Sequence, residues 1–303
     1  MNIAIVSHDA GGAEIISSWA LRQNAEFCLV VEGPAVEIFL RKLGSLQNLQ
    51  LETAIQQSDW VLCGSSWQSD LERRAISMCK SSGKKVVTFL DHWKNYRERF
   101  FFNKELILPD EIWVGDELAV EIAKSIFPSL PVVFIANPYF ADLLEEMNST
   151  TNLEKEDGQI YVLYICEPIR EHAYLQHGDE FFWGYTEEDA LKFFLNNLSF
   201  LNEQIYKIKI RPHPSEKMSK YYWAKEYSEL IVFSDGNHSL IEEISEADII
   251  VGCESMAMAI GLFANKRIIS CIPAGGKECS LPQVGIEHLQ AISPGNTKMN
   301  NEI

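Results

Sequence analysis

Residues 247–270 read ADIIVGCESMAMAIGLFANKRIIS, and this stretch decides the fold. The runs DIIVG (248–252) and RIISCI (267–272) are apolar and rich in β-branched residues, which is typical of buried strands. The segment between them predicts a helix, and its small residues would allow close packing on a sheet: Ala257, Ala259 and Gly261. A strand, a helix and a strand in this order predict two parallel strands covered by a helix.

The same alternation extends in both directions along the chain. The second half contains further strand-like runs at residues 160–165, 205–210 and 230–234. The first half contains them at residues 2–7, 27–31, 60–64, 85–90, 111–115 and 132–136. Amphipathic helical patterns separate these runs, including a long one at about 186–203, so we predict parallel sheets covered on both faces.

A polar segment, EEMNSTTNLEKEDG (145–158), interrupts this alternation and is the best linker candidate. A chain of 303 residues is also longer than most single cores, which stop growing at roughly 250–300 residues. We therefore predict an α/β fold with two Rossmann-like domains facing one another across a cleft. Their predicted bounds are 1–144 for the first domain, 145–158 for the linker, 159–290 for the second domain and 291–303 for a tail.

Composition excludes several classes of function. The formal net charge of −17 argues against a nucleic-acid partner, which would need clustered lysine and arginine. The amino terminus lacks a signal-peptide pattern, and no apolar run approaches the roughly 18 residues of a membrane span. Seven scattered cysteines without metal-ligand spacing predict reduced core residues in a cytoplasmic protein.

One histidine stands between two prolines at a strand end, in IRPHPSE (210–216). Pro212 must end the strand at about Arg211, and Pro214 suits the first position of a helix. His213 would then be the N-cap residue, beside N–H groups that suit a phosphate oxygen. The alternative is a turn whose histidine simply packs against the domain.

Two further strand ends in the second half carry polar side chains. Glu254 and Ser255 follow the strand at 248–252, where a hydroxyl and backbone N–H groups could bind an anion, although Ser255 could be a plain helix cap. In FSDGNHSLIEEI (233–244), Ser239 and Glu242 predict a capping box. The remaining side chains there could contact the ribose or base of a nucleotide: Asp235, Asn237 and His238.

The first half presents its own polar strand ends. His8 and Asp9 follow the first strand, and Gly11 and Gly12 let the backbone turn into a helix. Asp9 or His8 could act as a general base, or Asp9 could be a helix cap. The segment FLDHWKNYRERF (89–100) would suit an anionic or sugar-like ligand, with Trp93 stacking on it beside Asp91 and His92. A solvated helix face is the alternative for Arg97 and Arg99.

The order of these pieces resembles the donor domain of GT-B glycosyltransferases. IRPHPSE followed about 40 residues later by ADIIVGCESMAMAIGLF is most similar to bacterial sialyltransferases and related transferases of CMP-activated nonulosonic acids, with an HP motif and a serine motif. The resemblance implies that His213 and Ser255 hold the donor phosphate, with Pro214, Glu254 and Arg211 beside them. It also implies that Asp9 is the base, although HDAGG departs from the family's acidic pair, so His8 and Glu14 remain rivals.

The resemblance implies a metal-independent, inverting transfer to a capsule or lipopolysaccharide glycan, with no cofactor beyond the CMP-sugar donor. The first domain would bind the acceptor and the second would bind the donor. The predicted acceptor- or sugar-binding residues are Gly11, Gly12, Glu14, Asp91, His92 and Trp93. Membrane association would be peripheral at most, and the sequence does not determine the oligomeric state. Three alternatives stay open: a nucleotide-sugar 2-epimerase or hydrolase, a CDP-polyol phosphotransferase, and a non-catalytic subunit of a polysaccharide assembly complex that binds a nucleotide or glycan.

Overall fold

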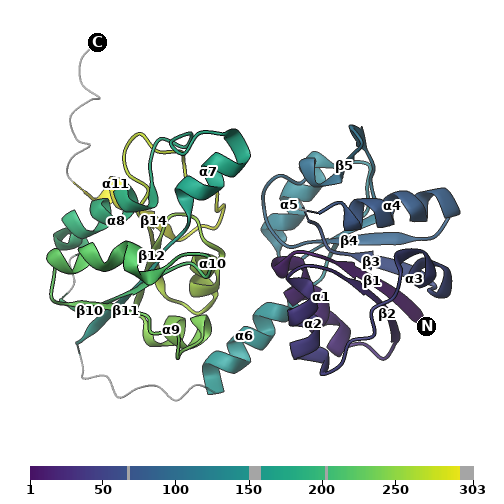
Figure 1. Cartoon of the computed structure of the whole chain (residues 1–303), viewed down its shortest axis with the longest axis horizontal. Helices are drawn as coiled ribbons and strands as arrows, with labels where there is room; N and C mark the ends of the chain where they lie inside the picture. Colours follow the sequence, from purple (N-terminus) through teal and green to yellow (C-terminus); the bar gives the residue numbers. More distant parts are fainter. Residues whose placement is uncertain (67–68, 150–157, 202–203, 294–303) are drawn as a thin grey trace, which may run out of the picture. The chain divides into compact units, whose positions relative to one another are not determined.

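The protein is described by a computed structural model that covers residues 1–66, 69–149, 158–201 and 204–293. Contacts divide the chain into two units, Met1–Asp142 and Leu143–Ile303, and each is described by itself (Figure 1). Each unit contains one six-stranded parallel sheet. All eleven strands predicted from the sequence are present.

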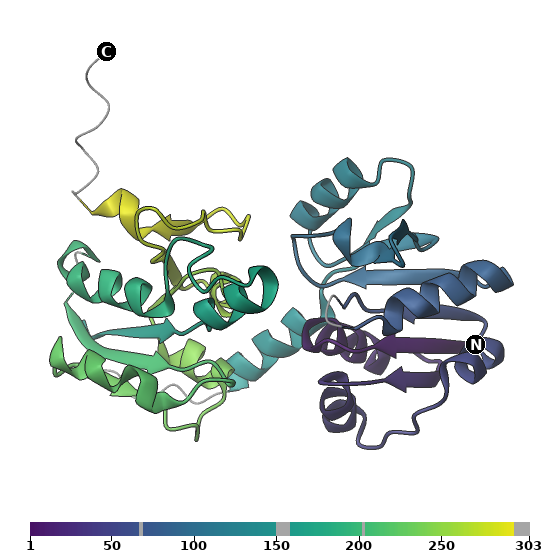
Figure 2. The same cartoon turned by 45° about the horizontal axis from the view of Figure 1, so that its top comes forward.

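The sheet of the first unit has the order β2-β1-β3-β4-β7-β8. The order reverses between β1 and β3, so the chain leaves these two neighbouring strands in opposite directions, as in other doubly wound sheets. Figure 2 shows the strands side by side with helices packed around them. The strand bounds are Asn2–Ser7 (β1), Glu26–Val31 (β2), Trp60–Cys63 (β3), Val86–Leu90 (β4), Glu111–Val114 (β7) and Val132–Phe134 (β8).

Six α-helices begin among the described residues of this unit, together with a short hairpin that the sequence did not predict. The hairpin pairs Phe101–Phe102 (β5) with Glu105–Leu106 (β6), and its turn residues Asn103 and Lys104 both have positive φ. Two-residue strands carry too little pattern to be read from sequence. The helices are Ala10–Leu21 (α1), Ala35–Leu43 (α2), Leu51–Gln57 (α3), Leu71–Ser82 (α4), Glu117–Ile126 (α5) and Pro138–Ser149 (α6), with a 3-10 turn at Glu98–Phe100 (η1).

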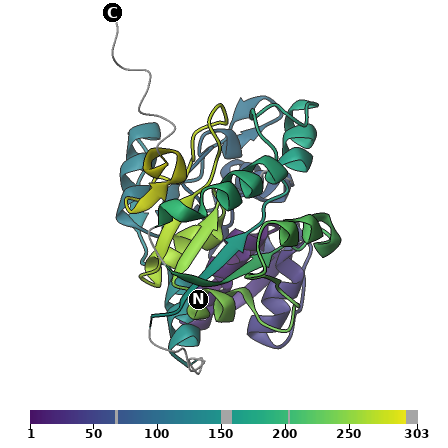
Figure 3. The same cartoon turned by 90° about the vertical axis from the view of Figure 1, so that its left-hand side faces the viewer.

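The sheet of the second unit has the order β11-β10-β9-β12-β13-β14. Figure 3, with this unit toward the viewer, shows helices above and below its strands. The strands are Ile160–Ile165 (β9), Ile205–Arg211 (β10), Ile231–Phe233 (β11), Ile249–Gly252 (β12), Arg267–Ser270 (β13) and Ile286–His288 (β14). The helices are Ile169–His177 (α7), Glu187–Asn196 (α8), Leu240–Glu246 (α9), Met256–Phe263 (α10) and Leu289–Ile292 (α11), with 3-10 helices at Leu198–Leu201 (η2) and Met218–Glu226 (η3).

The predicted strand, helix and strand at 247–270 is confirmed as β12, α10 and β13. The two strands pair in parallel, with Ile250 opposite Ile268. A Cβ atom on Gly261 would lie 2.4 Å from the Cδ1 atom of Ile250 and 2.7 Å from that of Ile268. The helix therefore packs closely on the sheet because this position lacks a side chain.

Three predicted boundaries need correction. Residues 145–149 of the predicted linker are helical, because α6 continues through Ser149, and 150–157 lie outside the described residues. The predicted long helix at 186–203 divides into α8 and η2, with 202–203 outside the described part. Helix α11 extends to Ile292, past the predicted start of the tail, of which 294–303 are not described.

Candidate functional site

Asp9 is the central side chain at the end of β1. Its backbone is extended at the N-cap position of α1, yet its carboxylate makes no capping hydrogen bond. The Oδ1 atom instead lies 2.7 Å from Nδ1 of His8 and accepts a 2.7 Å hydrogen bond from the Ser66 hydroxyl. Among the described residues, none donates to Oδ2. The helix-cap alternative for Asp9 is therefore wrong, and one carboxylate oxygen is available for chemistry.

Glu72 stabilises this strand end by accepting a hydrogen bond from the backbone of His8. It is the second residue of α4, is 2% exposed, and its Oε1 accepts the His8 N–H at 2.8 Å. Burial raises the pKa of Glu72 to about 7, and two hydrogen bonds from backbone N–H groups oppose the shift. Sequence reasoning missed this residue, because an acidic side chain in the first turn of a helix is ordinary.

Asp91, at the end of β4, belongs to the same edge of the sheet. Its Oδ1 accepts hydrogen bonds from Ser65 Oγ at 3.1 Å and from Arg99 Nη1 at 3.0 Å. Arg99 also donates to the Ser65 carbonyl at 2.6 Å, so the solvated-face alternative is wrong for Arg99. A Cβ atom on Gly11 would lie only 2.2 Å from Asp91 Oδ2. The structure thus brings together Gly11 and Asp91, two of the residues predicted to bind the acceptor or sugar.

Two other predicted residues of the first unit have different roles. Trp93 is 7% exposed and its indole N–H donates to Asp116 at 2.8 Å. A buried ring offers no face to a ligand, so the predicted stacking role is wrong. Glu14 pairs with Arg41 and with Lys42 on α2, the latter at 3.0 Å. These ion pairs stabilise the contact between α1 and α2 and weaken Glu14 as a rival base.

His92 and Gly12 are close to the same edge. The Nδ1 atom of His92 accepts the Trp93 N–H at 2.9 Å. A Cβ atom on Gly12 would lie 3.4 Å from the Cα atom of Gly64, an ordinary contact. Direct ligand contacts by either residue stay a prediction.

His213 follows β10, which ends at Arg211 as predicted, but no helix begins at Pro214. Residues 214–216 form a turn in which the Glu216 N–H bonds to the His213 carbonyl at 2.8 Å, and η3 begins only at Met218. The N-cap prediction is wrong because the Ser215 N–H bonds to His213 Nδ1 at 3.2 Å, which favours the turn. A neutral ring that accepts at Nδ1 carries its proton on Nε2, so His213 can donate from Nε2 to a ligand.

His172, on α7, was missed from the sequence. Its ring meets that of His213 edge to face, with centroids 6.2 Å apart. Desolvation and the neighbouring His213 both lower the pKa of His172. A histidine in a stretch without a strong apolar period gave no signal that it would lie beside a strand-end loop.

The loop between β12 and α10 is internally bonded. Ser255 caps α10 by accepting the Ala257 N–H at 3.2 Å, so the cap interpretation is correct. Glu167 accepts the N–H groups of Cys253 and Glu254 at 2.8 and 2.9 Å. These two N–H groups are therefore occupied, and the prediction that they could bind an anion is wrong. Glu254 itself accepts from Lys277 Nζ at 2.5 Å and from Ser280 Oγ at 2.7 Å.

The loop after β11 is held mainly by its own turn. Asp235 accepts the Asn237 N–H at 3.0 Å and its side-chain amide at 2.7 Å, and these bonds lower the pKa of Asp235. The predicted capping box of Ser239 and Glu242 is confirmed. Arg211 donates to buried Glu243 at 2.7 Å and to the His238 carbonyl at 3.2 Å. Nucleotide contacts by Asp235, Asn237, His238 and Arg211 stay a prediction.

A pocket of about 580 Å³ opens beside β13 and β14 in the second unit. This volume lies within the usual range for small-molecule sites. Lys277 links the pocket wall to Glu254 and so to the serine loop, and it also lies 3.8 Å from the centre of the Trp183 ring. The lining residues are Ile272, Gly276, Lys277, Glu278, Cys279, His288, Gln290 and Ala291.

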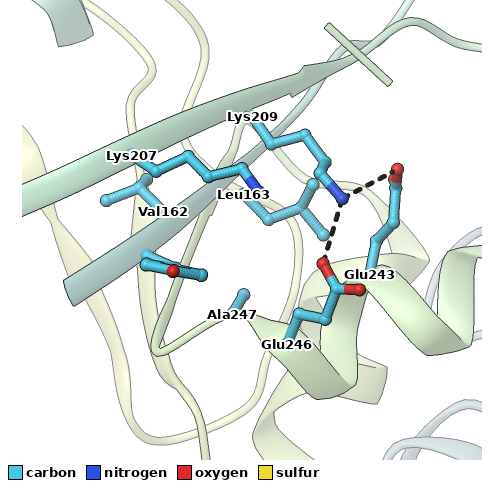
Figure 4. A pocket seen from close by; sticks show the side chains of 8 residues that line it. Val162, Leu163, Lys207, Lys209, Glu243, Glu246 and Ala247 are labelled. Carbon is cyan, nitrogen blue, oxygen red and sulfur yellow. Dashed lines mark hydrogen bonds and ion pairs between the residues drawn. The ribbon is translucent and has the colours of Figure 1, made fainter. Parts of the chain in front are cut away.

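A smaller pocket between β9, β10 and α9 is structural (Figure 4). Its volume of about 10 Å³ holds at most one water molecule. Lys209 bridges Glu246 at 3.0 Å and Glu243 at 3.5 Å across it. These ion pairs satisfy the charges, so this pocket is not a candidate ligand site.

The described residues contain no group of three histidine, cysteine, aspartate or glutamate side chains placed to hold a metal ion. Nor do they include a helix long and apolar enough to cross a bilayer.

Comparison with known proteins identifies the fold. No family model matches the chain, and no curated protein matches its sequence. The UDP-GlcNAc 2-epimerase from Methanocaldococcus jannaschii has a TM-score of 0.58 at 11% identity, over 89% of this chain and 83% of that chain. MurG from Acinetobacter baumannii has a TM-score of 0.52 at 11% identity, over 97% and 88%. The glycotransferase of kitacinnamycin has a TM-score of 0.54 at 12% identity, over 90% and 80%. Identities this low show the fold alone, and the predicted GT-B fold with two Rossmann-like units is confirmed.

Proposed function

We propose that this chain is a metal-independent glycosyltransferase that moves a nonulosonic acid from a CMP-activated donor to a hydroxyl of a surface glycan. The observation that carries the proposal is the orientation of Asp9, whose carboxylate is held by His8 and Ser66 instead of capping α1. The acceptor would be a capsule or lipopolysaccharide glycan. The transfer would take place in the cytoplasm, with at most peripheral contact with a membrane.

Asp9 would act as the general base. Both hydrogen bonds of its carboxylate fall on Oδ1, so the orientation is fixed while Oδ2 can receive a proton. A carboxylate presented at the carboxyl end of a parallel strand lies where ligands bind in such sheets. General-base catalysis contributes typically about 100- to 10,000-fold.

The donor would bind to the second unit. His213 and Ser255 follow β10 and β12, the two strands on either side of β9. Their Nε2–H and Oγ–H groups would hold the donor phosphate, a charge-assisted contact. A nonulosonic acid carries a carboxylate at its anomeric carbon, and Lys277 on the wall of the 580 Å³ pocket would pair with that carboxylate.

The reaction would be a single displacement. The acceptor hydroxyl would give its proton to Asp9 Oδ2 while its oxygen forms a bond to the anomeric carbon. The bond between that carbon and the phosphate oxygen would break, and CMP would leave with the electron pair. Hydrogen bonds from His213 and Ser255 would stabilise the charge that develops on the phosphate. One displacement inverts the configuration at the anomeric carbon.

The first test measures ligand binding by thermal shift with CMP, CDP, UDP and GDP. A ligand at 100 times its dissociation constant stabilises by about 2.7 kcal/mol, so selective stabilisation by CMP is expected. Asp9→Asn should reduce turnover by about 100- to 10,000-fold while CMP affinity stays unchanged. His213→Ala should reduce both, and Glu187→Gln, which changes a buried carboxylate elsewhere, serves as the control. Wild-type turnover in Asp9→Asn would refute the role of Asp9.

A UDP-sugar 2-epimerase or hydrolase is the second candidate, because two UDP-GlcNAc 2-epimerases share the fold with TM-scores of 0.58 and 0.55. Incubation with UDP-N-acetylhexosamine and no acceptor distinguishes this candidate. Rapid formation of the epimer or the free sugar would refute the transferase proposal and favour the epimerase or hydrolase. Transfer of a polyol phosphate from a CDP donor would instead identify the phosphotransferase alternative.

A further inference from the structure

Glu167 lies at the centre of the second unit's strand ends, and the proposed function does not use it. It follows β9, which is flanked in the sheet by β10 and β12. Its Oε1 accepts the N–H groups of Cys253 and Glu254 at 2.8 and 2.9 Å, and its Oε2 lies 3.3 Å from the Glu254 nitrogen. One side chain therefore fixes two consecutive peptide groups immediately before Ser255.

These contacts continue to the wall of the large pocket. The backbone of Glu254 is held by Glu167, and its side chain accepts from Lys277 at 2.5 Å and from Ser280 at 2.7 Å. The Ser270 hydroxyl donates to the Cys253 carbonyl at 2.8 Å, which fixes the loop from the β13 side. The orientation of Ser255 and the position of Lys277 thus both depend on bonds that begin at Glu167.

We infer that Glu167 is a positioning residue that fixes the β12–α10 loop for the donor phosphate, acting through the backbone of Cys253 and Glu254. This inference rests on the proposed function for its ligand. It assigns the phosphate to Ser255 and His213, because Glu167 already occupies the two N–H groups that an anion would otherwise take. A carboxylate with its full charge makes these bonds stronger than a neutral side chain would.

The surroundings of Glu167 connect this role to pH. Desolvation raises its pKa to about 7, with Glu254 raising it further and Lys277 and the two N–H bonds lowering it. The neighbouring thiols and the neighbouring phenol are neutral near this pH, because the pKa values of Cys166, Cys253, Cys279 and Tyr185 are all raised. The two N–H bonds lower the pKa of Glu167 relative to the same buried side chain without them, so they favour its charged form. For a local opening of the loop that breaks these bonds and leaves Glu167 buried, the bonded form is therefore stabilised as the pH rises through about 7.

The first experiment needs no ligand and uses the full chain. Hydrogen exchange of the Cys253 and Glu254 amides is measured from pH 6 to 8 in the wild type, in Glu167→Gln and in Glu187→Gln. The control residue is a buried carboxylate of the same unit that bonds to Arg170 and Lys220. Protection at the two amides should rise about tenfold with pH in the wild type and the control, and stay flat in Glu167→Gln. Equal protection and equal pH dependence in all three proteins would overturn the inference.

The second experiment measures CMP affinity by calorimetry over the same pH range. Glu167→Gln should bind about tenfold more weakly at pH 8 and lose the inflection near pH 7, whereas Glu187→Gln should follow the wild type. Unchanged affinity in Glu167→Gln beside altered exchange would reduce Glu167 to a purely structural residue and overturn the inference. Absence of CMP binding in the wild type would refute the proposed donor, and the exchange experiment would then decide the role of Glu167 alone.

Discussion

Each unit contains a glutamate that accepts backbone N–H groups from a strand-end loop, and the two differ in their surroundings. Glu72 accepts the His8 N–H and is sealed in the first unit at 2% exposure. Glu167 accepts two N–H groups in the second unit. It is only half-buried, and it lies beside the ion pair between Lys277 and Glu254. The pKa of each is raised to about 7 by desolvation. The comparison teaches that desolvation produces a similar shift in a sealed site and in a more open site, and we propose that it acts on stability in the sealed site and on ligand binding in the open site.

Glu72→Gln tests the sealed site and has the largest expected effect. The pKa of Glu72 is about 7 in the folded protein against 4.5 for the free side chain, so the folded state holds its proton longer. Stability is therefore lost as the pH rises from 4.5 to 7, by up to about 3 kcal/mol at pH 8. The variant has no carboxyl group to ionise at this position and so lacks this loss. The thermal midpoint of the variant minus that of the wild type should therefore be larger at pH 8 than at pH 4.5. An equal difference at both pH values would contradict the expectation.

Gly11→Ala tests how tightly the strand ends of the first unit are packed. A Cβ atom there would lie 2.2 Å from Asp91 Oδ2, and Asp91 is held by Ser65 and Arg99. Overpacking of this kind costs about 1–3 kcal/mol, so both the thermal midpoint and turnover should fall. Gly12→Ala is the matched control, because its nearest contact is 3.4 Å. Equal losses in both variants would mean that the close contact of Asp91 with Gly11 does not determine stability or turnover.

Ser255→Ala tests the open site and has the smallest expected effect on stability. Loss of the cap of α10 should cost about 1 kcal/mol. Ser239→Ala removes a comparable cap from α9 in the same unit and should cost about the same. Only Ser255→Ala should also weaken CMP binding in calorimetry. Equal CMP affinity in the two variants would leave Ser255 as a plain cap.

Local patterns predicted most of the fold and only some features of the site. All eleven predicted strands exist because long apolar runs between helical patterns have few other solutions. Strand β14 and helix α7 were missed, since IEH and IREHAYLQH lack a strong apolar period. At the site, the positions of Asp9, His213 and Ser255 at strand ends were correct. The predicted helix at Pro214 was not, because the ring of His213 bonds to its own turn.

The sequence by itself determined two parallel sheets and a set of polar residues at their carboxyl ends. These features follow from local periodicity and from proline and glycine constraints, which act over a few residues. Only the tertiary structure decided which of those side chains are available. Glu72 reaches His8 across 64 positions and Glu167 reaches Glu254 across 87. Such long-range hydrogen bonds and burial set the bonding and pKa of a carboxylate, and no short stretch of sequence encodes them.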